Sequence, residues 1–187
     1  MEETPVVEGQ LIFDQACITN KNMIHELELK GYGDLENEKL FLKSFETLFL
    51  LYSDKLILKK SKKKIDFDTM MGICQKQDDQ TLTKFLIYRD LRNRGYVVKD
   101  GFGFGSDFRV YERGQFGEKG AKFLIFGLNE GQQEKMGNLQ KKIEQITQMG
   151  KEPVIAVIER RGEVIYYKIN RMDFLENKSR LEESFQI

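Results

Sequence analysis

The chain of 187 residues has few of the residues on which many active sites depend. It contains one histidine, two cysteines and two prolines, and it has no tryptophan. Because the single histidine, His25, lies near the N-terminus, a histidine-dependent triad in the C-terminal part or a metal site with several histidines is close to excluded. Cys17 and Cys74 stand far apart outside any metal or redox motif, so we expect both to be small buried residues in a reducing cytosol.

The sequence also lacks a long apolar run and an excess of either charge. Apolar stretches such as residues 48–52 are much shorter than the roughly 20 residues that cross a bilayer, and residues 1–4 lack the basic start of a signal peptide. We therefore expect a cytoplasmic protein with no membrane partner. Lys+Arg and Asp+Glu are equal at 30 each, so no overall positive field attracts nucleic acid, and any RNA site has to be local.

One segment does combine positive charge with aromatic rings. Residues 84–113 carry seven basic and four acidic side chains, with tyrosines and phenylalanines between them. Such a mixture suits RNA phosphates and unstacked bases. It is equally typical of a solvated helix face followed by strand aromatics in a core, and composition alone leaves both interpretations open.

Residues 1–80 are predicted to form a small α/β domain. Two short strands are expected within residues 9–19, and apolar spacing predicts a helix over residues 36–52 with Asp34 as its N-cap. The remaining expected elements are a strand at 55–59, a lysine run at 60–64 and a short helix at 68–75. The lysine run is expected to be a solvated turn, with contact to RNA as the less favoured alternative. The polar residues 75–80 form the expected linker, because they interrupt both periodicities.

Residues 81–187 are predicted to form a second domain. A helix is expected to begin at Thr81 and to end at Gly95, and a second helix with an apolar face is expected to end at Gly150. The expected strands lie at 96–99, 107–112, 122–128, 154–158 and 164–169. The pattern is a helix, a run of strands, a helix and a hairpin.

The residues themselves identify no reaction. The glycine cluster at 101–105 resembles a phosphate cradle only superficially, because a strand and not a helix follows it, and a tight connection between two strands is expected there. Without histidine, acid and base chemistry falls to Tyr, Lys, Asp or Glu. Taken alone, Tyr111 is a strand tyrosine and Lys151 a surface lysine after the helix stop.

Three stretches of the second domain resemble the archaeal tRNA-intron (tRNA-splicing) endonuclease family. They are residues 85–114, residues 121–124, and residues 151–159 with 164–168, so the resemblance covers residues 82–171. It implies a small N-terminal α/β domain followed by a C-terminal nuclease domain with a mixed central sheet and two flanking helices. It also implies a metal-independent reaction with no cofactor, in which Tyr111 activates a ribose 2′-hydroxyl and Lys151 stabilises the charged phosphorane.

The sequence departs from the family pattern at two places. The family's catalytic histidine falls on Gly120, and Lys119 is the nearest residue that could supply the proton instead. Loss of a general acid typically costs about 10²- to 10⁴-fold in rate. The helix before Lys151 also lacks the arginine of the family's base clamp. The residues expected to contact RNA are Arg109, Arg113, Lys168 and Arg171.

The resemblance predicts a tRNA-splicing endoribonuclease subunit in a homo- or heterotetramer. Its expected substrate is precursor tRNA with a bulge-helix-bulge motif, cut to 2′,3′-cyclic phosphate and 5′-hydroxyl ends. The missing histidine favours an alternative, a non-catalytic structural subunit of a heterotetrameric endonuclease. A third possibility is an RNA-binding module without cleavage activity. We also expect the apolar, aromatic-rich strand at 164–169 to pair with another subunit, because it is an aggregation hazard at an open edge.

Overall fold

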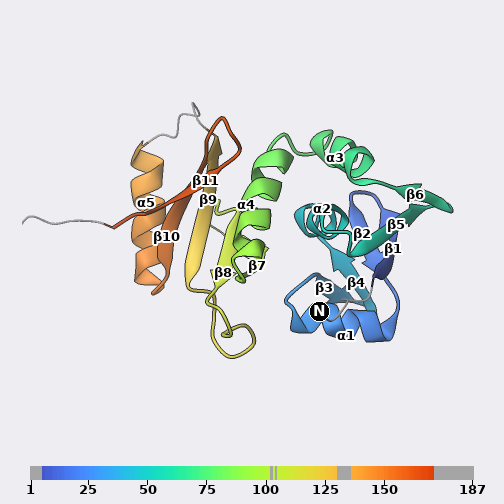
Figure 1. Cartoon of the computed structure of the whole chain (residues 1–187). Coiled ribbons are helices and arrows are strands. Elements are labelled where there is room, and N and C mark those ends of the chain that lie inside the picture. Colours follow the sequence, from blue (N-terminus) through green and yellow to red (C-terminus); the bar gives the residue numbers. More distant parts are fainter. Residues whose placement is uncertain (1–5, 102, 104, 130–135, 171–187) are drawn as a thin grey trace, which may run out of the picture.

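The computed structural model describes residues 6–101, 103, 105–129 and 136–170. Its N-terminal part is a six-stranded sheet with three helices (Figure 1). The strand order is β3-β4-β2-β1-β5-β6, and β1 and β5 run parallel. The elements are β1 (Val7–Ile12), β2 (Gln15–Ile18), α1 (Lys21–Leu29), β3 (Asp34–Glu36), β4 (Lys39–Leu42), α2 (Ser44–Tyr52), β5 (Leu56–Lys60), β6 (Lys63–Ile65) and α3 (Phe67–Gln75).

The expected helix over residues 36–52 is wrong in its first half, where a hairpin joins β3 to β4. Asn37 and Glu38 both have positive φ, 48° and 60°, which is the geometry of the tight turn between two antiparallel strands. Leu40 and Leu42 are buried on the same side of β4, as a strand period requires. Asp34 therefore begins β3 and caps no helix.

The N-terminus of α2 is instead closed at Lys43. The Glu46 carboxylate, in the first turn, accepts a hydrogen bond from the backbone N–H of Lys43 at 2.8 Å. Helix α1 was not expected, because only Ile24 and Leu27 are buried along its nine residues and two positions give little periodic signal. Its N-cap is Asn20, whose side chain accepts from two backbone N–H groups.

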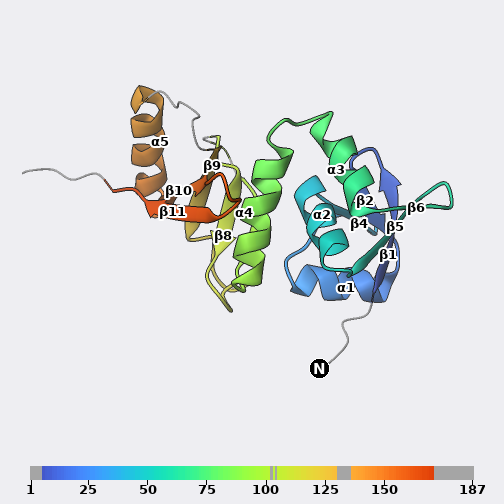
Figure 2. The ribbon, with the colours of Figure 1, turned by 45° about the horizontal axis from the view of Figure 1, so that its top comes forward.

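The C-terminal part confirms a mixed sheet between two helices. Its elements are α4 (Thr81–Asn93), β7 (Val97–Asp100), β8 (Phe108–Tyr111), β9 (Phe123–Asn129), α5 (Met136–Gln148), β10 (Glu152–Ile158) and β11 (Val164–Lys168). The sheet order is β11-β10-β9-β8-β7, and β9 and β10 are the only parallel pair among the described strands of this sheet. Helices α4 and α5 lie on opposite faces of this sheet (Figures 1 and 2).

The glycine cluster connects β7 to β8, as expected for a link between two strands. The N–H of Gly101 donates to the Asp107 carbonyl at 2.9 Å. A β-carbon on Gly101 would lie 1.8 Å from the carbonyl oxygen of Ser106, so only glycine fits this close approach. The backbone here closes a strand connection and does not lead into a helix N-terminus.

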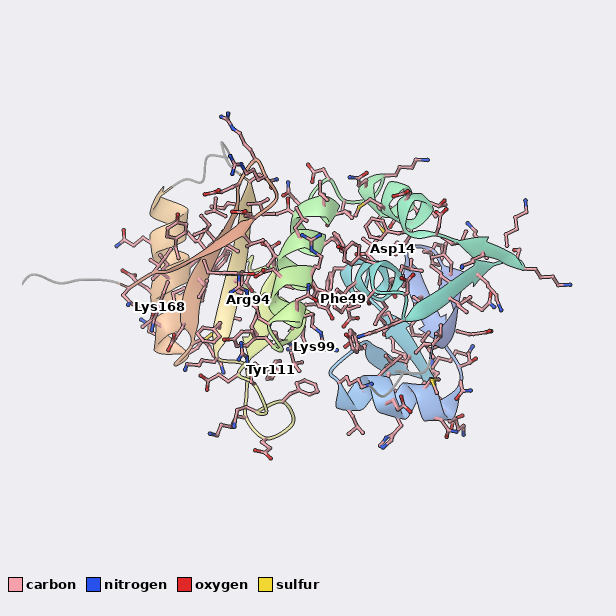
Figure 3. All side chains as sticks on the ribbon, in the orientation of Figure 1. Asp14, Phe49, Arg94, Lys99, Tyr111 and Lys168 are labelled. Carbon is pink, nitrogen blue, oxygen red and sulfur yellow. The ribbon has the colours of Figure 1, made fainter. Side chains whose placement is uncertain are left out.

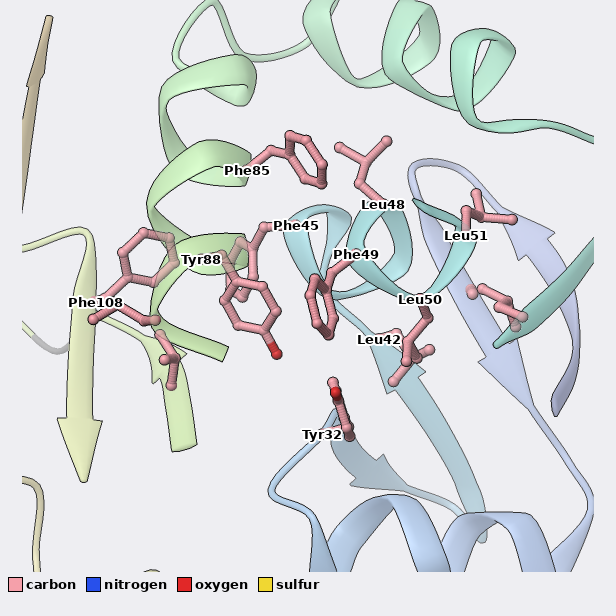
Figure 4. Close-up of a cluster of buried hydrophobic side chains, with 14 of the residues drawn as sticks. Tyr32, Leu42, Phe45, Leu48, Phe49, Leu50, Leu51, Phe85, Tyr88 and Phe108 are labelled. Carbon is pink, nitrogen blue, oxygen red and sulfur yellow. The ribbon is translucent and has the colours of Figure 1, made fainter. Parts of the chain in front are cut away.

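The N- and C-terminal parts share one hydrophobic core between α2 and α4 (Figures 3 and 4). The ring of Phe45 on α2 lies 4.9 Å from that of Tyr88 on α4 and 5.0 Å from that of Phe108 on β8. Nearby, the guanidinium of Arg92 lies 4.0 Å from the ring centre of Tyr32. The domain boundary predicted at residues 80 and 81 falls in the turn between α3 and α4, and it stays a prediction.

Two further expectations concern cysteine burial and membrane spans. Cys17 and Cys74 are free thiols, and both are buried, which confirms the expected burial. Burial raises the pKa of the Cys74 thiol to about 12. Over the described ranges, none of the helices has the length and apolarity needed to cross a membrane.

Candidate active site

Strand β8 presents Tyr111 and Arg109 on one face of the C-terminal sheet. Phe108 and Val110 are buried toward the shared core. Because side chains alternate between the two faces of a strand, Arg109 and Tyr111 lie on the opposite face. Tyr111 is the last residue of β8, at the start of the loop to β9 (Figure 3). Its ring meets that of Phe116 edge to face at 5.0 Å, which orients the phenol from within the loop.

Lys151 follows the end of α5 and lies at the same face of the C-terminal sheet as Tyr111. Gly150 has a φ of 68°, and its N–H donates to the carbonyl of Thr147 at 2.9 Å. The N–H of Lys151 donates to the carbonyl of Ile146 at 3.1 Å, so the chain leaves the helix through a glycine-dependent stop. Strand β10 begins directly afterwards, and its first residues pair with the start of β9.

The loop over residues 112–122 carries Gly120 to this position. Its ends are held together by an ion pair between Glu112 and Lys122, and the N–H of Lys122 donates to the carbonyl of Val110 at 2.9 Å. The ammonium of Lys151 donates a hydrogen bond to the carbonyl of Ala121, next to Gly120. The loop and the end of α5 are therefore in direct contact.

These elements enclose a cavity of about 230 Å³. Its described lining residues are Arg109, Tyr111, Gly120, Ala121, Leu124, Met149 and Lys151. A tyrosine, an arginine and a lysine thus line one cavity together with apolar residues. Such a set can bind an anion and position a phenol near it, which suits chemistry at a phosphodiester.

Arg109 also reaches a second cavity, which the sequence did not predict. This cavity of about 150 Å³ lies where the two parts of the chain meet, and it is lined by Asp34, Lys43, Glu46, Lys99, Asp100, Gly101 and Arg109. The Nε of Arg109 is buried and has no hydrogen-bond partner among the described residues. The only sequence signal for this cluster was Glu46 three residues after Lys43 at a helix start.

Glu46 is the most deeply buried group of this second cavity, with 1% of its surface exposed. Burial raises its pKa to about 7, although the Lys99 charge and the N–H groups of Lys43 and Gly33 act in the opposite direction. Lys99 forms an ion pair with Asp34 at 3.2 Å. Burial acts to raise the pKa of Asp34, but Lys99 and Lys43 lower it overall.

Other residues predicted to act in the site lie elsewhere. Lys119 and Arg113 are exposed and are not among the described lining residues of the Tyr111 cavity, and the guanidinium of Arg113 stacks 5.1 Å from the ring centre of Tyr96. Lys168 on β11 pairs with Glu152 at 2.9 Å. Arg171 lies outside the described residues. Their roles stay predictions.

The described residues offer neither a metal site nor a histidine at the Tyr111 cavity. Over the part of the chain that the structure describes, no group of three or more His, Cys, Asp or Glu residues is arranged to hold a metal ion. His25 is exposed on α1 and is not among the described residues that line the Tyr111 cavity.

Comparison with known proteins places both parts of the chain in one family. Residues 7–71 match the model of the tRNA intron endonuclease N-terminal domain, and residues 81–166 match the model of its catalytic C-terminal domain. The tRNA-splicing endonuclease of Thermococcus onnurineus is 32% identical over 169 residues, which cover 90% of this chain and 98% of that protein. Those of Methanococcus vannielii and Pyrococcus furiosus are 32% and 29% identical and cover 87% and 90% of this chain and 93% and 98% of their own lengths.

Proposed function

Because this chain belongs to the tRNA-splicing endonuclease family, we propose that it is a subunit that cleaves precursor tRNA at intron–exon junctions. The proposed substrate is a bulge-helix-bulge RNA, and the proposed products carry a 2′,3′-cyclic phosphate and a 5′-hydroxyl. The observation that carries this proposal is the meeting of Tyr111, Gly120 and Lys151 in one cavity.

In this proposal the reaction needs no group beyond side chains and the RNA itself. The phenol of Tyr111 assists removal of the proton from the ribose 2′-hydroxyl, and the 2′-oxygen attacks the adjacent phosphorus. The ammonium of Lys151 balances the charge that develops on the phosphorane oxygens, which is commonly worth about 3 kcal/mol for one such donor. The bond from phosphorus to the 5′-oxygen then breaks, and that oxygen takes up the proton released by the 2′-hydroxyl, passed on through Tyr111 or water, so that no proton is gained or lost overall.

Gly120 is the reason to keep a second candidate function. With glycine at the histidine position, no imidazole of this loop donates the final proton, and a subunit relieved of catalysis would tolerate that loss. A structural subunit would, however, be under no need to retain Tyr111 and Lys151 in one cavity. The cavity therefore favours the catalytic role over the structural one.

The test is incubation of the purified chain with a labelled bulge-helix-bulge RNA under single-turnover conditions. Cutting at the two bulges, with cyclic phosphate ends, supports a catalytic subunit. Cutting only after another family subunit is added, and insensitive to changes at Tyr111 and Lys151, supports the structural role. Binding without cutting in either arrangement supports an RNA-binding module.

A further inference from the structure

The hairpin formed by β5 and β6 concentrates positive charge at one end of the molecule. Residues 59–64 include five lysines and one serine, and residues 55–65 contain no acidic residue. Strand β6 is the edge of the N-terminal sheet, and Figure 1 shows the hairpin projecting at the end of the molecule opposite α5. Since the whole chain is balanced at 30 residues of each sign, this is a local field.

Most of this charge is exposed, and its described acidic neighbours are Glu8, which pairs with Lys59, and Asp66, which attracts Lys64. Lys60, Lys62, Lys63 and Lys64 are exposed, whereas Lys59 is partly buried and forms an ion pair with Glu8 at 3.0 Å. Within the described ranges, no ion pair involves Lys60, Lys62 or Lys63.

The register of the hairpin sets like charges against each other. Lys59 lies directly opposite Lys64, and Lys60 lies directly opposite Lys63. Like charges at directly opposed positions destabilise an antiparallel pair. The arrangement therefore lowers the stability of the hairpin that carries it.

The turn of the hairpin adds a second cost. Ser61 and Lys62 have φ values of 46° and 72°, in the left-handed region that glycine and asparagine favour in two-residue turns. A lysine at this position is strained. Two independent costs at one exposed place, offset only in part by the Lys59–Glu8 ion pair and the attraction between Lys64 and Asp66, indicate that the charge is kept for binding.

We propose that this lysine hairpin binds the phosphate backbone of RNA away from the cleaved bond. The identification of the anionic partner as RNA rests on the proposed function. Lysine ammonium groups act as point charges toward phosphates, and residues 59–64 offer no aromatic ring or amide with which to read a base. The contact is therefore independent of base sequence and adds affinity without selecting the bulge.

An edge strand can also carry lysines simply to prevent pairing with another sheet. That role needs charge of either sign, whereas phosphate binding needs positive charge. The two explanations are separated by replacing lysine with glutamate, which preserves edge protection and reverses the field.

The experiment compares Lys60→Gln/Lys63→Gln with the control Lys21→Gln/Lys39→Gln, which removes two exposed lysines from the same part of the chain. Affinity for a labelled bulge-helix-bulge RNA with extended helical arms is measured between 50 and 300 mM salt. Each lost phosphate contact flattens the slope of log affinity against log salt by about 0.7 to 0.9. We expect a hairpin variant that binds about 10-fold more weakly at low salt, with a slope flatter by about 1.4 to 1.8.

Two further readouts distinguish binding from folding. Lys60→Glu places opposite charges at positions 60 and 63, so its melting temperature should be no lower than that of the wild type while its RNA affinity falls. Cleavage at saturating protein should stay within about twofold of wild type, because the hairpin is remote from the Tyr111 cavity.

The proposal is overturned if the hairpin variant keeps the affinity and salt slope of the control, or if Lys60→Glu binds as well as wild type. A wild-type chain that cleaves while the hairpin variants bind normally defeats the hairpin proposal alone. A chain that binds RNA through the hairpin without cutting, even with other family subunits, defeats the proposed catalytic function alone. A wild-type chain with no affinity for RNA defeats both.

Discussion

A β-carbon on Gly120 would lie 3.2 Å from the ammonium nitrogen of Lys151. Position 120 therefore faces the lysine directly, and a side chain added there would enter the cavity that holds Tyr111. The contact is with the far end of a flexible side chain, so a small shift of the lysine would make room. This relationship makes Gly120 a position at which the proposed loss of a general acid can be tested.

Replacing Gly120 with histidine should raise the single-turnover cleavage rate by up to about 10²-fold, because an imidazole there can protonate the leaving 5′-oxygen. Gly120→Ala is the matched control, since it adds the β-carbon without the acid. If the histidine variant folds, binds RNA and cuts no faster than the alanine variant, position 120 does not face the leaving group.

The wild-type rate should rise with pH through the neutral range and lack an acid limb of the histidine type. No imidazole lines the described cavity, and the 2′-hydroxyl becomes easier to activate as pH rises. Single-turnover rates from about pH 5 to 9 bracket the histidine range. His25→Ala and Lys119→Ala belong in the same series, and a bell-shaped profile that disappears in either variant would identify that residue as the proton donor.

Lys151→Ala should reduce cleavage by at least about 10²-fold and leave RNA binding nearly unchanged, because stabilisation of the phosphorane acts mainly in the transition state. Lys141→Ala is the control, since it removes an exposed lysine from the preceding helix. Quantitative product analysis by gel and thermal unfolding of both variants separate lost chemistry from lost folding. Cutting by Lys151→Ala within a few-fold of wild type would contradict the assigned role.

The chain should not be a monomer at micromolar concentration. Strand β11 forms the edge of the C-terminal sheet, and Tyr167 on it is 53% exposed. An exposed edge that carries a large aromatic side chain is more stable when another chain pairs with it. Light scattering measures the mass, with Tyr167→Lys as the variant expected to dissociate. A wild-type mass of one chain would rule out this interface.

The free energy of unfolding should fall as pH rises from about 4.5 to about 7 because of Glu46. Burial raises the pKa of this carboxyl from 4.5 in the unfolded chain to about 7 in the fold, so the folded state binds the proton more tightly. The resulting stability is complete below the lower value and is lost above the higher one, a change of about 3 kcal/mol. Glu46→Gln should flatten urea-derived stability over this window, whereas Glu36→Gln, at an exposed carboxyl, should not. Equal slopes for wild type and Glu46→Gln would show that another group titrates.

The sequence predicted those parts of the fold in which local pattern and tertiary packing agree. Helix α4 begins at Thr81 as expected and stops beside Gly95, whose φ is 84°. The hairpin between β3 and β4 was missed because Leu40 and Phe41 also fit a helical spacing that continues into α2. The turn depends on positive φ at Asn37 and Glu38. Neither residue is a glycine, so the sequence does not indicate the turn.

The candidate site could likewise be predicted from the sequence only in part. Tyr111 and Lys151 were predicted as catalytic residues through motif resemblance, since spacing alone gives a strand tyrosine and a surface lysine, and the structure places both at one cavity. The cluster of Glu46, Lys99 and Arg109 could not be found, because Glu46 lies on α2 whereas Lys99 and Arg109 lie on β7 and β8, and they meet only after the two parts of the chain pack together. Long-range polar contacts of this kind leave no periodic signal in the sequence.

The aromatic rings of Phe45, Tyr88 and Phe108, which pack between α2, α4 and β8, couple the two parts of the chain. The ring of Phe45 on α2 packs against that of Phe108, three residues before Tyr111 on the same strand, so a substitution of Phe45 changes the packing of the strand that carries the proposed catalytic tyrosine. The segments at 7–71 and 81–166 are consequently not interchangeable parts. A chimera that joins these segments from two relatives should therefore fold well only where the packed faces of α2 and α4 match.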